Sequence, residues 1–184
     1  MAGCNSSDDP STTTSPSSST TSSTTSSTTS SSSSTSSSSS TTSAYVPVKP
    51  TFPPAAKKQT DAGAVAFVEY YWAATNYALT KPDPDLLVGL SAPSCDACEA
   101  TVTGARELVA DNHRYTNSTL TVESTEFIFN SKGSAAILTR VDFLPTTVVD
   151  EKGKVLQSLP RELATRVVNL KWTDQWQVDS VAAG

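Results

Sequence analysis

Cysteine is the residue type in this 184-residue chain whose positions most clearly point to chemistry. The first of its three cysteines closes the sequence Met1-Ala2-Gly3-Cys4, the small-small-Cys pattern that ends a bacterial lipoprotein signal. Neither a basic n-region nor an apolar h-region precedes Cys4, so we expect that the start codon was placed too late or that the signal was trimmed. The pattern predicts a lipid on Cys4 and a membrane anchor.

The other two cysteines, Cys95 and Cys98, have CxxC spacing. An even pair in an exported chain predicts a disulfide. Ser94 is a candidate N-cap, and Asp96 complements the positive end of a helix dipole, so the pair should begin a helix. Thiol oxidoreductases also place a reactive pair there. We favour a structural disulfide, because no Trp precedes the pair and no βαβ pattern surrounds it. Zinc would need two further ligands, and His113 is the chain's one histidine.

Other catalytic chemistry has little support in the sequence. His113 lies in a polar stretch at an expected helix end, where a solvated side chain is the usual state. Asp142 lies between Val141 and Phe143, and period 2 places it opposite the apolar set. HExxH, GxSxG, P-loop and Rossmann patterns are absent. We therefore assign no catalytic residue, metal ligand or cofactor. Five aromatic residues can line a ligand cavity or belong to the core: Tyr70, Tyr71, Trp72, Trp172 and Trp176.

The N-terminal part of the chain cannot form a core. From Ser11 to Thr42 every residue except Pro16 is Ser or Thr, so nothing apolar offsets the entropy lost on folding. We expect residues 5–43 to be a disordered linker between the lipobox remnant, residues 1–4, and the rest of the chain. The net charge is −5, and no basic run exceeds Lys57-Lys58. Nucleic acid is therefore not an expected partner.

The rest of the sequence predicts a proline-rich extended segment, residues 44–59, and an α+β domain, residues 60–184. Apolar periodicity predicts three helices: one from Thr60 or Asp61 to Leu79, a short one from Pro84 to Leu90, and one from Cys95 to residues 112–114. After Tyr115 the period changes to 2, and a turn at residues 150–154 with Gly153 predicts a hairpin. The expected fold is three N-terminal helices packed on one curved antiparallel sheet.

This order of elements, the aromatic first helix and a final Trp176-Gln177-Val178 strand resemble the NTF2-like or cystatin-like cone. More specifically, the sequence resembles an actinobacterial lipoprotein family of unknown function, of the domain of unknown function 6318 type. The motifs that carry this resemblance are Ala2-Gly3-Cys4, PTFPPAAK at 50–57, FVEYYW at 67–72 and SCDAC at 94–98. The resemblance implies a high-GC Gram-positive host and a cell-surface location. It implies no activity.

Three functional hypotheses follow. We favour a non-enzymatic binding or accessory module, held by its lipid on the extracellular face of the cell membrane, that contacts an envelope protein or a small apolar ligand. The second hypothesis is a pocket enzyme of the cone fold, of the isomerase or hydrolase type. The third is a thiol-disulfide protein that uses Cys95 and Cys98.

Overall fold

The structure is a computed structural model that describes residues 45–184. Its longest helix, α1 (Asp61–Thr80), begins where the sequence places its cap. The Thr60 hydroxyl accepts a hydrogen bond from the Gly63 amide at 3.1 Å, which satisfies one of the free N–H groups of the first turn. Phe67, Val68 and most other apolar residues of α1 are buried. The helix is therefore covered on more than one side, as its aromatic content predicts.

The chain before α1 is extended and packs along that helix. It holds a short 3-10 turn, η1 (Pro54–Lys57). The Phe52 ring meets Phe67 and Tyr70 edge-on, with centroids 6.2 and 4.7 Å apart. Lys49 Nζ lies 3.0 Å from Asp83 Oδ2. These contacts join the proline-rich segment to the domain.

The expectation of three helices is wrong, because the residues from Pro84 form only a 3-10 turn, η2 (Pro84–Leu86). Gly89 has φ +83°, a left-handed conformation that a right-handed helix does not contain. A helix that began at Pro84 would therefore end within two turns. The backbone then pairs with a strand: Val178 N donates to Leu90 O at 2.9 Å, and Ala92 N donates to Val178 O at 2.8 Å. A strand partner far along the chain therefore replaces the hydrogen bonds that a short helix would have made.

The second and last α-helix of the described residues is α2 (Asp96–Ala110), which buries Cys98, Val102 and Ala105. Its N-cap is Cys95, whose Sγ accepts a hydrogen bond from the Cys98 amide at 3.3 Å. The expectation that Ser94 caps this helix is wrong. Its hydroxyl instead donates to Asp179 Oδ1 at 3.3 Å, which connects the loop to the C-terminal strand.

The strands form two antiparallel sheets rather than the single curved sheet expected. One has the order β2-β3-β6-β7 and the other β1-β4-β5. Pro145 and Pro160 lie where the chain passes from one sheet to the other, and proline cannot donate a ladder hydrogen bond. The strands are β1 (Arg114–Tyr115), β2 (Leu120–Ser131), β3 (Ser134–Phe143), β4 (Thr146–Val149), β5 (Val155–Leu159), β6 (Glu162–Trp172) and β7 (Trp176–Ala183).

The hairpin of β4 and β5 confirms the turn predicted at residues 150–154. Asp150 Oδ1 accepts hydrogen bonds from the amides of Lys152 and Lys154, each at 2.9 Å. Gly153 has φ +80°, a conformation that glycine adopts without steric cost. Hydrogen bonds among residues 150–154 therefore hold this turn.

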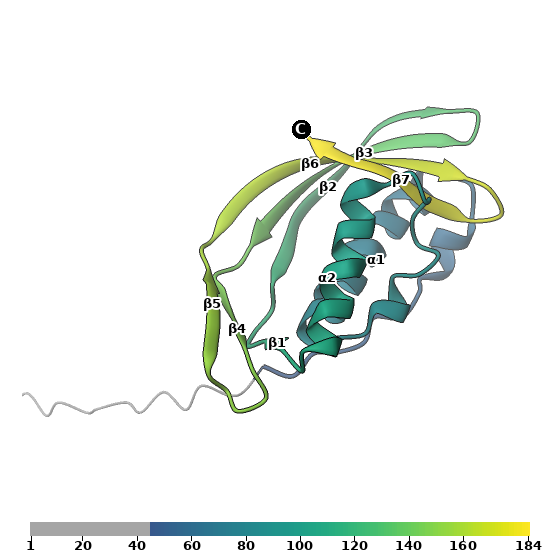
Figure 1. The fold of residues 1–184 in the computed structure, drawn as a ribbon. Helices are drawn as coiled ribbons and strands as arrows, with labels where there is room; N and C mark the ends of the chain where they lie inside the picture. Colours follow the sequence, from purple (N-terminus) through teal and green to yellow (C-terminus); the bar gives the residue numbers. More distant parts are fainter. Residues whose placement is uncertain (1–44) are drawn as a thin grey trace, which may run out of the picture. The chain divides into compact units, whose positions relative to one another are not determined.

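The core lies between the helices and one face of the four-stranded sheet, which curves over them while β1, β4 and β5 lie at one end (Figure 1). Its largest fully buried side chains include Phe67, Ile137, Leu170 and Trp176. Within residues 45–184, no helix has the length and apolar content to span a bilayer.

Candidate functional site

A cavity of about 410 Å³ lies between α1, α2 and the inner face of the four-stranded sheet. The β1 strand and the loops at the end of the sheet complete its wall. Most of the lining side chains are apolar or aromatic. They are Tyr71, Trp72, Thr75, Leu79, Ala97, Thr101, Tyr115, Thr119, Leu120, Phe143, Leu144, Thr146, Leu159, Pro160, Glu162, Arg166 and Val181.

Helical and strand periods bring this wall together. Tyr71, Thr75 and Leu79 recur every four residues, which places them on one face of α1. Phe143 extends the wall from the end of β3, and its ring meets the Trp72 ring edge-on with centroids 6.4 Å apart. The helix α1 and the strand β3 thus fix the aromatic part of the cavity.

One ion pair lies in the wall, formed by Arg166 and Glu162 of β6. Arg166 Nη2 is 3.4 Å from Glu162 Oε1, and the side chains are 28% and 64% exposed respectively. The guanidinium also lies over the Phe143 ring, 5.7 Å from its centroid, and Nη1 donates to Thr165 O at 3.2 Å. Arg166 is therefore the more covered partner and contacts the aromatic wall.

Two lining residues carry buried polar atoms that have no hydrogen-bond partner among the described residues, namely Trp72 Nε1 and Thr75 Oγ1. A buried donor without a partner costs about 1–3 kcal/mol. Burial also raises the pKa of Tyr71 to about 12, so its phenol is neutral at physiological pH and can act as a hydrogen-bond donor. The cavity thus combines an apolar wall with a few polar groups.

Of the five aromatic residues proposed from sequence as cavity lining, Tyr71 and Trp72 lie in this wall, whereas Tyr70, Trp172 and Trp176 do not. Tyr70 packs on Phe52 of the N-terminal segment. The Trp172 and Trp176 rings meet edge-on, with centroids 5.2 Å apart. Trp176 Nε1 donates to Lys58 O at 2.9 Å, which connects β7 to the segment before α1.

Three lining residues were not predicted from the sequence, namely Phe143, Val181 and Arg166, which the register of the sheet brings to the cavity. For Arg166, the sequence pattern of β6 could have indicated a position in the cavity wall. Along β6 it falls on the same parity as Ala164 and Val168, both buried, so its charged side chain lies between two core residues on the inner face of the sheet. Such a residue is a candidate for function.

Cys95 and Cys98 are joined by a disulfide at the start of α2. Each residue is 2% exposed. Thiol exchange needs an incoming thiolate to reach a sulfur atom, and burial opposes this. The neighbouring Ala97 lines the cavity, so the disulfide fixes one part of the wall.

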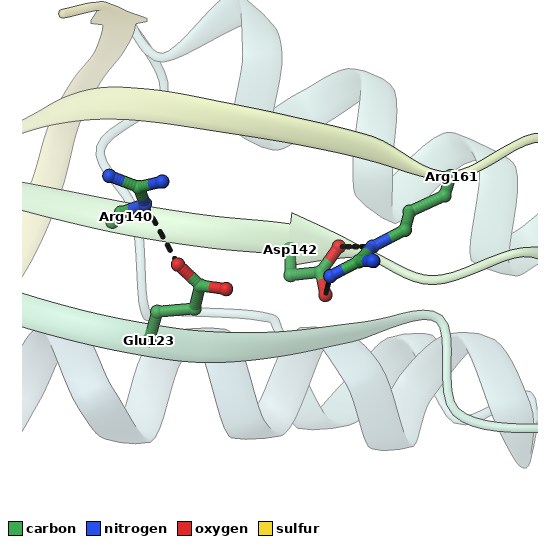
Figure 2. Close-up of polar contacts among 4 residues, drawn as sticks. All are labelled: Glu123, Arg140, Asp142 and Arg161. Carbon is green, nitrogen blue, oxygen red and sulfur yellow. Dashed lines mark hydrogen bonds and ion pairs between the residues drawn. The ribbon is translucent and has the colours of Figure 1, made fainter. Parts of the chain in front are cut away.

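Asp142 is buried but does not line the cavity. Figure 2 shows its side chain on the face of the sheet away from the helices, beside Arg161, with the Glu123–Arg140 pair nearby. Arg161 donates to both carboxylate oxygens, at 2.8 and 2.7 Å, and thereby holds the pKa of the Asp142 carboxyl below its usual range. The residue is an ion-pair partner in the sheet, away from the aromatic wall.

His113 follows α2, and its Nδ1 lies 4.0 Å from Asp111 Oδ2. It lines a smaller hollow beside the cavity together with Leu79 and Tyr115. Residues 45–184 contain no group of three or more His, Cys, Asp and Glu side chains placed to hold a metal ion. Cys4 and the linker at residues 5–43 lie outside the described residues.

Comparison with known proteins gives a family match and several structural neighbours. A family model described as "Family of unknown function (DUF6318)" matches residues 34–182. No curated protein matches the sequence. The intermembrane space region of the chloroplast protein ARC6 aligns with a TM-score of 0.50 at 12% identity, covering 68% of this chain and 97% of that chain.

Two further neighbours are weaker. The protein Aln2 from a Streptomyces species has a TM-score of 0.44 at 14% identity, covering 68% of this chain and 92% of its own. A chain named Rd1NTF2_05 has a TM-score of 0.34 at 14% identity, covering 60% and 90%. At such identities, structural likeness concerns the fold and not the activity.

Proposed function

Since the chain belongs to the DUF6318 family, whose description carries no activity, we propose a function from the cavity itself: the domain is a binding module for a small, largely apolar ligand. We further propose that a lipid on Cys4 displays this domain on the extracellular face of the cell membrane. In this proposal the protein binds its ligand without transforming it.

The observation that carries the binding proposal is the cavity wall. Ligand sites usually have volumes of about 300–1,000 Å³ and apolar or aromatic walls with a few polar groups. The volume of about 410 Å³ lies in this range, and the wall joins Tyr71 and Trp72 of α1 to Phe143 of β3. A fully packed core would leave no such space.

The arrangement of titratable groups favours binding over acid–base catalysis. A general base has to be deprotonated near neutral pH and within hydrogen-bond reach of the reacting group. In the wall, Tyr71 has a pKa of about 12, and Glu162 is paired with Arg166 at the exposed edge. Asp142, the acid considered from the sequence, is paired with Arg161 away from the cavity.

A cavity-filling substitution tests the site. Thr101 lies on α2, lines the cavity and is partly exposed, so a larger side chain can enter the cavity without replacing a core residue. We expect Thr101→Trp to weaken binding of the neutral fluorophores Nile red and 1-aminoanthracene at least tenfold. Thr103→Trp is the matched control, because Thr103 is exposed on the same helix and does not line the cavity. Equal binding by both variants would contradict the proposed site.

Cell-surface display needs a separate test, since the cavity carries no information on location. The full chain would be expressed behind a complete lipoprotein signal, beside Cys4→Ala with the same signal. We expect the parent in the membrane fraction and the variant in the soluble extracellular fraction. Retention of the Cys4→Ala protein in the membrane would refute the lipid anchor.

A further inference from the structure

Among residues 45–184, Arg166 is the one positively charged residue in the cavity wall. We propose that it selects ligands in which a carboxylate is attached to an apolar body, an inference that rests on the proposed binding function. Its position is unusual for a solvated arginine. Ala164 and Val168, two residues away on either side along β6, are 8% and 0% exposed, and the Arg166 side chain itself is 28% exposed. The charge therefore lies on the inner face of the sheet.

The guanidinium has unused donors. Arginine carries five N–H groups in a planar fork. Within residues 45–184, Arg166 makes two hydrogen bonds, from Nη1 to Thr165 O at 3.2 Å and from Nη2 to Glu162 Oε1 at 3.4 Å. The remaining N–H groups make no hydrogen bond within these residues and are free for a ligand, and the guanidinium carbon lies 5.7 Å from the centroid of the Phe143 ring.

Glu162 is a counter-ion that a ligand can displace. Its contact of 3.4 Å exceeds the 2.7–2.9 Å that is typical of a charge-assisted N–H to oxygen hydrogen bond, and its side chain is 64% exposed. The Arg161–Asp142 pair has shorter contacts, since Asp142 accepts two hydrogen bonds from Arg161, at 2.8 and 2.7 Å. A ligand carboxylate that made such a bidentate contact would release Glu162 to solvent.

The wall favours a carboxylate over other charged groups. A planar carboxylate matches the arginine fork with two parallel hydrogen bonds. A phosphate ester carries more negative charge, and Glu162 beside Arg166 opposes it. An amine would be attracted to Glu162 but repelled by Arg166, which lies closer to the aromatic wall. The apolar residues of α1 and β7, Leu79 and Val181 among them, would cover the ligand body.

The test compares each acid with its neutral amide. Decanoate with decanamide, and 2-naphthylacetate with 2-naphthylacetamide, represent alkyl and aryl bodies, with affinities measured by calorimetry and by displacement of Nile red. In the parent protein we expect at least one acid to bind about tenfold or more tightly than its amide. Arg166→Gln should bring that ratio close to 1, and Arg166→Lys should give an intermediate ratio.

Glu162→Gln is a second, independent test, because we expect it to change acid affinity in the direction opposite to Arg166→Gln. Removal of the competing carboxylate should strengthen acid binding several-fold and raise the ratio of acid affinity to amide affinity above that of the parent. Melting curves and Nile red binding show whether each variant is folded. If acid and amide bind equally to the parent, or if Arg166→Gln keeps the ratio, acid selection is refuted while the binding function stands. If neither the paired compounds nor Nile red bind, the proposed binding function fails as well.

Discussion

Arg161 and Asp142 form the best-defined ion pair of the domain: Arg161 Nε lies 2.8 Å from Asp142 Oδ1, and Nη2 lies 2.7 Å from Oδ2 (Figure 2). Asp142 belongs to β3, and Arg161 directly precedes β6, its neighbour in the sheet. The Asp142 side chain is 7% exposed and that of Arg161 is 62% exposed. Since Arg161 lies next to the proline between the two sheets, the pair fixes the point where the chain enters the larger sheet.

This pair predicts a specific pH dependence of stability. Its hydrogen bonds lower the pKa of Asp142 in the folded state, so the unfolded chain binds a proton more readily at acidic pH. The stabilisation is therefore complete above the unfolded pKa of about 4 and is lost as the pH falls through the folded pKa. We expect Asp142→Asn to be less stable than the parent at pH 7, with the difference shrinking below pH 4, as measured by urea unfolding.

The neighbouring pair of Glu123 and Arg140 supplies the control for this experiment. Its contact of 2.8 Å lies on the same face, but the side chains are 38% and 53% exposed. Exposed pairs typically contribute about 0–1 kcal/mol. Glu123→Gln should therefore change the free energy of unfolding less than Asp142→Asn at pH 7. A larger effect of the Glu123 variant would show that burial of the carboxylate does not control this stability.

Two helical glycines predict opposite effects of the same substitution. At Gly63 an added Cβ would meet the carbonyl oxygens of Lys58 and, at 2.8 Å, Ala55, both backbone atoms. At Gly104, in α2, an added Cβ meets nothing within 4 Å. Gly63→Ala should lower the free energy of unfolding by about 1–3 kcal/mol through crowding. Gly104→Ala should raise it by about 0.5–1 kcal/mol through helix propensity. Thermal or urea unfolding measures both, and a stabilised Gly63 variant would contradict the close approach.

Elements with local signals could be predicted from the sequence. The cap at Thr60, the amphipathic helix after Cys95 and the turn at Gly153 each depend on residues within a few positions of one another. The absence of the short helix expected from Pro84 to Leu90 could not be predicted in this way. Leu90 and Ala92 pair with Val178, more than 80 residues away, and this pairing replaces the helical hydrogen bonds. The division into two sheets likewise depends on which strands meet after Pro145 and Pro160.

The cavity, too, could be predicted only where its residues lie on one element of the sequence. The aromatic pattern of α1 predicted Tyr71 and Trp72, which line the cavity, but also Tyr70, which packs on Phe52 instead. Trp172 and Trp176 were included on residue type alone, and the register of β6 and β7 places them outside the cavity wall. Phe143, Val181 and Arg166 come together through strand pairing over long sequence separations. A single sequence does not define that pairing.

The disulfide at the start of α2 predicts a stability effect. Besides closing a short loop, Cys95 accepts the hydrogen bond that caps the helix. Loop-closure entropy for so short a loop amounts to about 2 kcal/mol. We therefore expect Cys95→Ala/Cys98→Ala to lower the free energy of unfolding by about that amount in urea, and a reducing agent to destabilise the parent but not the variant. An unchanged midpoint for the variant would show that the disulfide does not stabilise the helix start.

Tyr71 predicts a loss of stability at alkaline pH. Burial raises its folded-state pKa to about 12, whereas the unfolded phenol has a pKa near 10. As the pH rises, the unfolded chain therefore loses this proton before the folded protein does. The contribution of this phenol to stability is complete below pH 10 and is lost as the pH rises toward 12. At pH 11 the unfolded state gains about 1 kcal/mol from ionisation that the folded state does not gain. Relative to Tyr71→Phe, the parent should therefore lose about 1 kcal/mol of stability between pH 8 and pH 11. The free energy of unfolding of both proteins would be measured in urea across this range. If it falls equally with pH in the parent and in Tyr71→Phe, the phenol is accessible to solvent and the cavity wall is open at Tyr71.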